Sequence, residues 1–244
     1  MIISHSNKFI FFKPLKCAGS SIEYDLNRYC NQSDLSAPGV AIDNVTYEYP
    51  PRGNIRFNSH DDPDYFFKNI RQMTRTNFEE YRSITIIRNP WDQMVSFYWW
   101  YINSQNLANK INDDHIVTGM SDIKIKFKSL INSRLILDKG VNSRSGYSTE
   151  NVLNSFSQKN QKFIHNSITD YLSYEDIKRE YKNLLVNMGL IEGCDHVHLK
   201  RFKSNIRKLN NHYSDYYDEE TKNQVAKAFN FTLHRFNYSF KKKD

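Results

Sequence analysis

The segment that most constrains the fold runs from Phe9 to Glu23, FIFFKPLKCAGSSIE. Its apolar run Phe9–Phe12 suits a strand of a parallel sheet that is covered on both faces. The small residues after this run let the backbone turn tightly, and Gly19 can take a positive φ there. Two serines follow where a helix would begin. The segment therefore predicts a buried strand, a tight turn, and a helix whose first turn carries hydroxyl groups.

An anion is the expected occupant of this turn. The first amides of a helix have no partner within the helix, and Ser20 and Ser21 add two hydroxyls at that end. Lys16 adds a positive charge. The order of residues differs from the Walker sequence, in which the lysine follows a glycine and stands immediately before Ser or Thr, because here Lys16 precedes Gly19 by three positions.

A second strand followed by a helix is predicted for Ser83–Tyr98, SITIIRNPWDQMVSFY. The isoleucines supply the strand, Asn89 can cap the helix, and Pro90 suits its first position. Arg88 ends the strand, and Ser96 lies about two turns into the helix. Both side chains can therefore reach one crevice at the carboxyl ends of the strands.

Together, these two segments resemble the sulfotransferase family, which uses 3′-phosphoadenosine 5′-phosphosulfate (PAPS) as its donor. The first family signature is a lysine followed by a glycine-threonine-serine turn that cradles the 5′-phosphosulfate. Its counterparts here are Lys16, Cys17, Ala18, Gly19, Ser20 and Ser21. The second signature is Arg-Asn-Pro-x-Asp with a later helical serine, matched here by Arg88–Asp92 and Ser96. The resemblance implies that Arg88 and Ser96 hold the 3′-phosphate.

The resemblance extends over nearly the whole chain. Leu172–Ile177 is similar to the family's Tyr-Glu-Asp-Leu element, and Arg235–Phe240 is similar to its Phe-Gly-Tyr-x-Phe finish. Asn237 replaces the usual glycine there, and asparagine is the non-glycine residue that best tolerates a positive φ. Lys203 and Ser204 correspond to a late loop that closes over the 3′-phosphate in relatives. The alternative for these two residues is a solvated, basic helix end.

The expected fold is α/β, a P-loop-like three-layer arrangement in which helices flank a central parallel sheet. A chain of 244 residues can bury one sizeable core, so a single domain over residues 1–244 is the simplest division. The polar stretches 30–64 and 103–150 are expected to be acceptor-side loop regions, with room for one strand in the first and a helix near Asp122–Leu137 in the second. Helices are also expected over Tyr174–Met188 and Glu219–Phe236, with a short strand within Gly189–Gly193.

Charge and cysteine content narrow the class of protein. The net charge of +7 suits an anionic nucleotide, an acidic glycan, nucleic acid or an anionic membrane surface, and it does not choose among them. Three cysteines without a disulfide-dense or metal-ligand spacing are typical of a reducing compartment. The sequence shows neither a secretory leader nor a membrane-spanning run, which predicts a cytoplasmic enzyme of bacterial or viral origin, unlike the membrane-anchored Golgi relatives.

Sulfuryl transfer to a hydroxyl needs a base, and histidine titrates closest to neutral pH. His60 lies between the two nucleotide segments, where many family members carry a histidine, and is the expected base. His115, Glu23 and Asp25 are alternatives, and His60 could instead bind the acceptor or have no function. Lys16 is expected to stabilise negative charge on the bridging oxygen as 3′-phosphoadenosine 5′-phosphate (PAP) leaves.

No metal is expected in this chemistry. His196 and His198 alternate as metal ligands can, but no further cluster of ligands supports them in the sequence. Metal binding by this pair is therefore disfavoured.

The expected acceptor is a hydroxyl of a carbohydrate, on a glycan or glycolipid, because the Arg-Asn-Pro-Trp-Asp segment resembles the carbohydrate branch of the family. An amine or a protein tyrosine is left open. An NTP-dependent kinase or other phosphotransferase shares the phosphate cradle, but the chain lacks the Walker lysine and an obvious acidic strand end for Mg²⁺. A non-enzymatic nucleic-acid-binding protein would suit the charge, but the basic residues are dispersed.

Overall fold

A computed structural model gives the fold of residues 1–36, 40–42, 45–47, 58–74, 76–109, 119–133, 151–200, 202, 206–207, 209 and 211–243. The chain divides into two compact units. Residues 1–88 and 162–204 form the first unit, and residues 89–161 and 205–244 form the second. The single domain over 1–244 stays a prediction.

The first unit is α/β and contains a mixed five-stranded sheet with strand order β3-β1-β2-β6-β7. The strands are β1 (Ile2–Ser4), β2 (Phe9–Phe11), β3 (Leu35–Ser36), β6 (Arg82–Ile87) and β7 (Asp170–Ser173). β2, β6 and β7 run parallel, as predicted. β1 pairs antiparallel with β2 and β3, so the prediction of a parallel sheet is wrong at this edge. Residues 5–8 connect β1 to β2, and so short a connection permits only an antiparallel pair.

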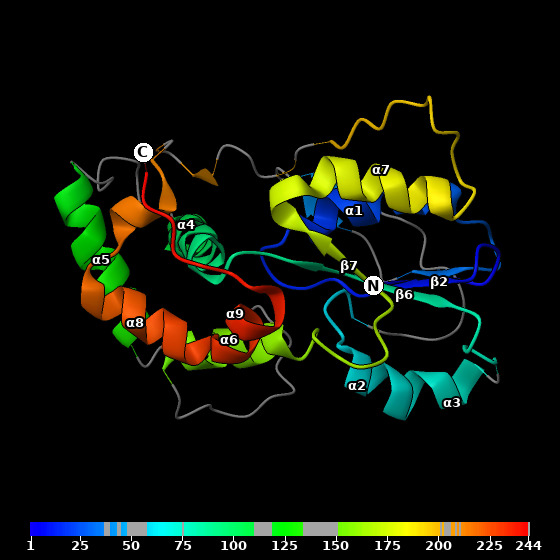
Figure 1. The fold of residues 1–244 in the computed structure, drawn as a ribbon, viewed down its shortest axis with the longest axis horizontal. Coiled ribbons are helices and arrows are strands. Elements are labelled where there is room, and N and C mark those ends of the chain that lie inside the picture. Colours follow the sequence, from blue (N-terminus) through cyan, green and yellow to red (C-terminus); the bar gives the residue numbers. More distant parts are fainter. Residues whose placement is uncertain are drawn as a thin grey trace. The chain divides into compact units, whose positions relative to one another are not determined.

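Helices cover both faces of this sheet (Figure 1). The helical segments described in the first unit are α1 (Gly19–Leu26), η1 (Asn27–Tyr29), α2 (Pro63–Tyr65), the π-helix η2 (Phe66–Ile70), α3 (Arg71–Thr74), η4 (Tyr174–Asp176) and α7 (Ile177–Asn187). Phe9 and Phe11 belong to the core cluster under α1 and α7. Ile10 and Phe12 belong to the opposite cluster, together with Phe66 of η2. This alternation explains why the strand is apolar at every position.

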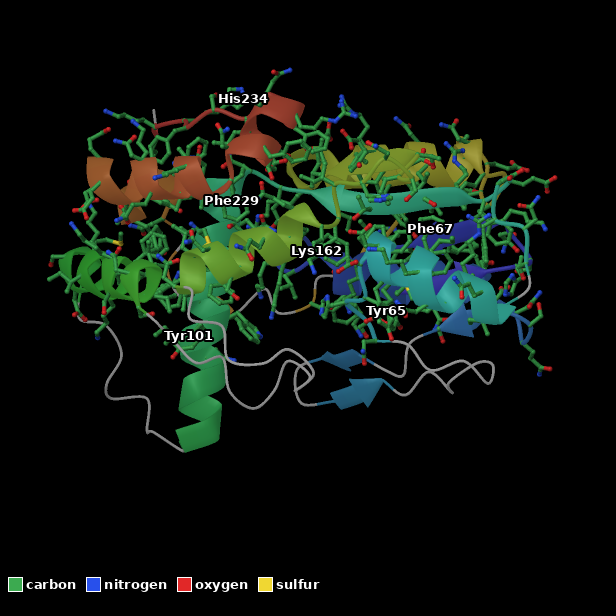
Figure 2. All side chains as sticks on the ribbon, turned by 90° about the horizontal axis from the view of Figure 1, so that it is seen from below. Tyr65, Phe67, Tyr101, Lys162, Phe229 and His234 are labelled. Atoms are coloured by element: carbon green, nitrogen blue, oxygen red, sulfur yellow. The ribbon has the colours of Figure 1, made fainter. Side chains whose placement is uncertain are left out.

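Residues 162–165, which precede β7 in the chain, contact the helices α2 and η2. Phe67 of η2, labelled in Figure 2, stacks on His165 with 6.1 Å between ring centroids. His165 Nε2 lies 3.3 Å from the Asp64 carboxylate of α2. Lys162 lies 3.6 Å from the Asp62 carboxylate, which also accepts the Tyr65 amide as the N-cap of α2.

Two expectations fail in the connecting regions. The hairpin of β4 (Val40–Ile42) and β5 (Val45–Tyr47), together with β3, gives three short strands in 30–64, where the sequence indicated room for one. Gly189–Gly193 forms turns and contains no strand. These three strands have two or three residues each, which is too short for an alternating pattern to be recognised.

The described part of the second unit is helical. Its helices are α4 (Pro90–Asn109), α5 (Met120–Asn132), α6 (Val152–Gln161), η6 (Tyr213–Tyr216), α8 (Glu219–Ala228) and α9 (Asn230–Phe236). Phe127 of α5 lies edge-on to Tyr98, Tyr216 and Tyr217, with ring centroids 5.7, 6.0 and 5.0 Å away. The expected helix over Glu219–Phe236 is two helices, because Phe229 departs from helical geometry (φ −105°, ψ 20°).

Asn237 ends α9 in the left-handed conformation, with φ 54° and ψ 36°, so the prediction that it takes a glycine-type position is confirmed. The Tyr238 amide then bonds back to the Leu233 carbonyl at 3.1 Å. The turn delivers Phe240 edge-on to Trp91, 5.3 Å away. Among the residues described, no helix combines the length and hydrophobicity that crossing a bilayer requires.

Asn237→Ala should destabilise the second unit by about 1 kcal/mol, because alanine pays the full cost of a left-handed backbone. Asn237→Gly should be neutral or stabilising at the same position. Urea unfolding followed by tryptophan fluorescence measures this unit selectively, since Trp91, Trp99 and Trp100 all belong to it. Equal unfolding free energies for the two variants would contradict the prediction.

Candidate functional site

The turn between β2 and α1 is tight and leads directly into the helix. Lys16 and Ala18 both adopt left-handed backbone conformations, with φ 62° and 58°. The Ala18 carbonyl accepts the amides of Ser21 at 2.9 Å and Ile22 at 3.3 Å. The preceding amides, those of Gly19 and Ser20, are the donors that a helix N-terminus directs outward. The predicted loop and helix start are therefore present.

Gly19 has a different role from the one expected. It is the first residue of α1 and lacks the positive φ that the sequence suggested, which Lys16 and Ala18 adopt instead. A Cβ atom at Gly19 would lie 2.6 Å from Cγ of Lys13. Position 19 therefore needs glycine because the Lys13 side chain crosses it.

The other small and polar residues of the loop face different surroundings. Cys17 is buried in the core cluster under α1, and its thiol donates to the Leu15 carbonyl at 3.4 Å. Ser21 is also buried, whereas Ser20 is half-buried. Cys17 can therefore contribute only its backbone to a ligand, while Ser20 is placed to offer a hydroxyl.

Arg88 lies immediately after β6 and is brought to the loop by the parallel pairing of β6 with β2. Its guanidinium donates to the Lys16 carbonyl at 2.7 Å. The same guanidinium lies over the ring of Tyr174, 3.8 Å from its centroid, and Arg88 is buried. The sequence placed Tyr174 in an element that resembles one of the family, but no sequence signal connects it with Arg88. The structure thus joins two predicted site residues, Lys16 and Arg88.

The remaining predicted donor ligands are not joined to this group. Ser96 lies half-buried on α4 in the second unit, so its partnership with Arg88 stays a prediction. The predicted cap of α4 is confirmed, because the Asn89 side chain accepts the Trp91 amide at 3.1 Å. Lys203 and Ser204 lie outside the residues that the structure describes.

His60 is held by the same segment that carries the loop. Its Nδ1 lies 2.8 Å from the Lys13 carbonyl. Since a carbonyl only accepts, Nδ1 carries the proton and Nε2 has the lone pair. Burial of its surroundings and the Lys13 ammonium lower the pKa of His60 to about 4. The side chain itself is exposed, and solvent at that surface moderates the shift, but the direction keeps the ring neutral at pH 7.

The two carboxylates proposed as alternative bases, Glu23 and Asp25, are both buried and bound to other groups. Glu23 is buried, and its carboxylate binds Nζ of Lys13 at 2.6 Å and the amino group of Met1 at 2.7 Å. Burial alone would raise its pKa, but these two cations hold it below the ordinary value. Asp25 is buried and accepts the Tyr181 hydroxyl at 2.8 Å. His115 lies outside the described residues.

Lys13 also belongs to this group of residues. It directly follows the apolar strand, and the structure directs its side chain inward with 5% of its surface exposed. A lysine directly after an apolar strand was the available signal, but its buried partner could not be read from the pattern.

The described residues contain no group of three or more His, Cys, Asp or Glu side chains that could hold a metal ion. The rings of His196 and His198 are 6.5 Å apart. Comparisons of the chain with protein-family models, with curated proteins and with solved structures each found no match.

Gly19→Ala should destabilise the protein by about 1–3 kcal/mol, because the new methyl group overlaps a buried lysine stem that an ion pair holds in place. The control is Gly193→Ala, where an added Cβ meets nothing within 4 Å and the effect should stay within about 0.5 kcal/mol. Urea unfolding monitored by far-UV circular dichroism measures both. Equal stability of the two variants would show that Lys13 moves aside at little cost.

Proposed function

We propose that this chain transfers the sulfuryl group of PAPS to a hydroxyl of a carbohydrate acceptor, without a metal ion, and that its first unit is a P-loop-like three-layer fold. The observation that carries the proposal is the bond from the Arg88 guanidinium to the carbonyl of Lys16. It joins the two segments that resemble the donor-binding signatures of sulfotransferases.

The contacts support distinct roles in donor binding. The amides at the start of α1, the Ser20 hydroxyl and the Lys16 ammonium form the cradle for the 5′-phosphosulfate. A guanidinium has five N–H donors, so Arg88 can brace the loop and also contact a phosphate oxygen. Ser96, Lys203 and Ser204 complete the proposed 3′-phosphate site.

The reaction is an in-line displacement at sulfur. His60 Nε2 accepts the proton of the acceptor hydroxyl as its oxygen bonds to sulfur, and the bond from sulfur to the bridging oxygen breaks. Negative charge then develops on the phosphate of PAP, where Lys16 stabilises it. Positioning and electrostatics supply most of the catalysis, as they do in phosphoryl transfer. Acceptor selection is assigned to the regions 30–64 and 103–150.

Lys16→Ala and Arg88→Ala should each weaken PAP binding about 10- to 100-fold, the usual effect of losing a hydrogen bond to a charged group. Isothermal titration calorimetry with PAP, and with ATP plus Mg²⁺ for comparison, measures this directly. Wild-type protein should bind PAP without metal and bind ATP much more weakly.

Two matched variants control for general effects. Lys8→Ala removes another lysine in a left-handed conformation, φ 53°, in the turn between β1 and β2. Arg82→Ala removes the arginine at the opposite end of β6, where it pairs with Asp170 at 2.7 Å. Both should keep wild-type affinity for PAP. A preference of the wild type for ATP with Mg²⁺ would overturn the proposal and favour a phosphotransferase.

His60→Ala should retain PAP affinity and lose about 10²- to 10⁴-fold in transfer rate, because the hydroxyl loses its proton acceptor. The assay is release of PAP from PAPS in the presence of a panel of mono- and oligosaccharides. The control is His165→Ala, which removes a histidine that contacts Ser167 and Phe67 and lies outside the proposed site, and it should be nearly silent. Near-wild-type transfer by His60→Ala would reject His60 as the base.

The pH profile gives a second test of this base. The ring must be neutral to accept a proton, and its pKa is lowered from 6.5 to about 4. The acid limb of kcat/KM, which reports the free enzyme, should therefore lie below pH 6.5 and toward pH 4. An acid limb at or above pH 6.5 that disappears in His60→Gln would contradict the lowered pKa.

A further inference from the structure

Lys13 makes three separate contacts within the first unit. Its Nζ binds the Glu23 carboxylate of α1 at 2.6 Å, and both side chains are buried. Its stem crosses Gly19, where a Cβ would lie 2.6 Å from Cγ. Its carbonyl accepts the Nδ1 proton of His60 at 2.8 Å. One residue thus contacts the start of α1, a helix carboxylate and the candidate base.

We propose that Lys13 is a positioning residue, which holds His60 in its tautomer and orientation and locks it to the anion-binding loop through Gly19 and Glu23. The proposal rests on the proposed function, because it assigns a reaction to the group that Lys13 organises. The effect of Lys13 on the titration of His60 can be measured without any substrate.

The chemistry of the pair favours a role beyond stability. The free energy needed to remove two charges from water often exceeds the free energy that their attraction returns. Apolar residues of similar volume therefore often stabilise a core equally well. Lys13 and Glu23 nevertheless lie at 6% and 5% side-chain exposure beside the loop. The charges of Lys13 and Glu23 are therefore close enough to influence the protonation of His60.

The charged groups that face His60 oppose one another. The ammonium of Lys13 and the amino group of Met1 disfavour protonation of the ring, and the Glu23 carboxylate favours it. Asp61 acts on the Met1 amino group. Removing the Lys13 charge and removing the Glu23 charge should therefore shift the proton affinity of His60 in opposite directions.

The test uses Lys13→Met, which keeps the carbonyl and most of the stem but removes the charge. NMR titration of the His60 ring, assigned by comparison with His60→Gln, should show its proton affinity raised at least about tenfold, one pKa unit. The transfer rate should fall, because loss of the bond to Glu23 releases the segment whose carbonyl orients the His60 ring. PAP affinity should stay within about threefold of wild type, because the stem over Gly19 remains.

Lys162→Met is the matched control. Lys162, labelled in Figure 2, pairs with Asp62 at 3.6 Å, two residues after His60, but its side chain is 58% exposed. This variant should leave the titration of His60 and the transfer rate unchanged. Glu23→Gln should lower the proton affinity of His60, and it decides the question if Lys13→Met does not fold.

The outcomes separate the two proposals. An unchanged His60 titration in folded Lys13→Met, or the same direction of shift in Glu23→Gln, overturns the positioning role even if PAP binds. Opposite shifts in the two variants support the link even if the wild type fails to bind PAP, and that failure rejects only the sulfotransferase function. Opposite shifts with wild-type transfer rates in both variants also overturn the positioning role.

Discussion

The parallel pairing of β2 with β6 is the interaction on which the candidate site depends. Phe11 lies opposite Ile84, the Phe12 amide donates to the Ile84 carbonyl at 2.8 Å, and the Thr85 hydroxyl donates to the Phe12 carbonyl at 3.1 Å. This register makes both strands end at the same edge of the sheet. Residues that follow them, Lys16 and Arg88, can therefore meet although 72 positions separate them in the chain. A slip of one residue would turn these side chains to the other face.

Local chemistry made part of this arrangement predictable. Unbroken apolar runs indicated buried parallel strands, Asn89 and Pro90 indicated the start of α4, and Asn237 indicated a left-handed helix end. Each of these features is determined by a few consecutive residues, so the sequence pattern alone is enough to predict it. The antiparallel β1 was missed because a strand of three residues has no recognisable period, and the break at Phe229 was missed because no glycine or proline marks it.

The electrostatic organisation of the site could not be predicted, because it depends on contacts between distant residues. The sequence offered Glu23 and Asp25 as alternative bases. In the fold, Glu23 is bound to the Lys13 ammonium, and Asp25 accepts the Tyr181 hydroxyl from α7. His60 gains the opposite property, since its surroundings disfavour the charged ring and leave Nε2 as a proton acceptor. The expected base and its two carboxylate alternatives are thus distinguished by their environments.

The backbone of the loop is strained at two residues that are not glycine. A left-handed conformation costs a non-glycine residue roughly 1–2 kcal/mol, and both Lys16 and Ala18 adopt it. Such strain persists where the surrounding structure fixes the conformation, as the Arg88 bond to the Lys16 carbonyl and the buried Cys17 do here. Glycine at position 16 would relieve the strain but remove the positive charge of the lysine side chain. The strained lysine therefore favours an anion as the ligand of this loop.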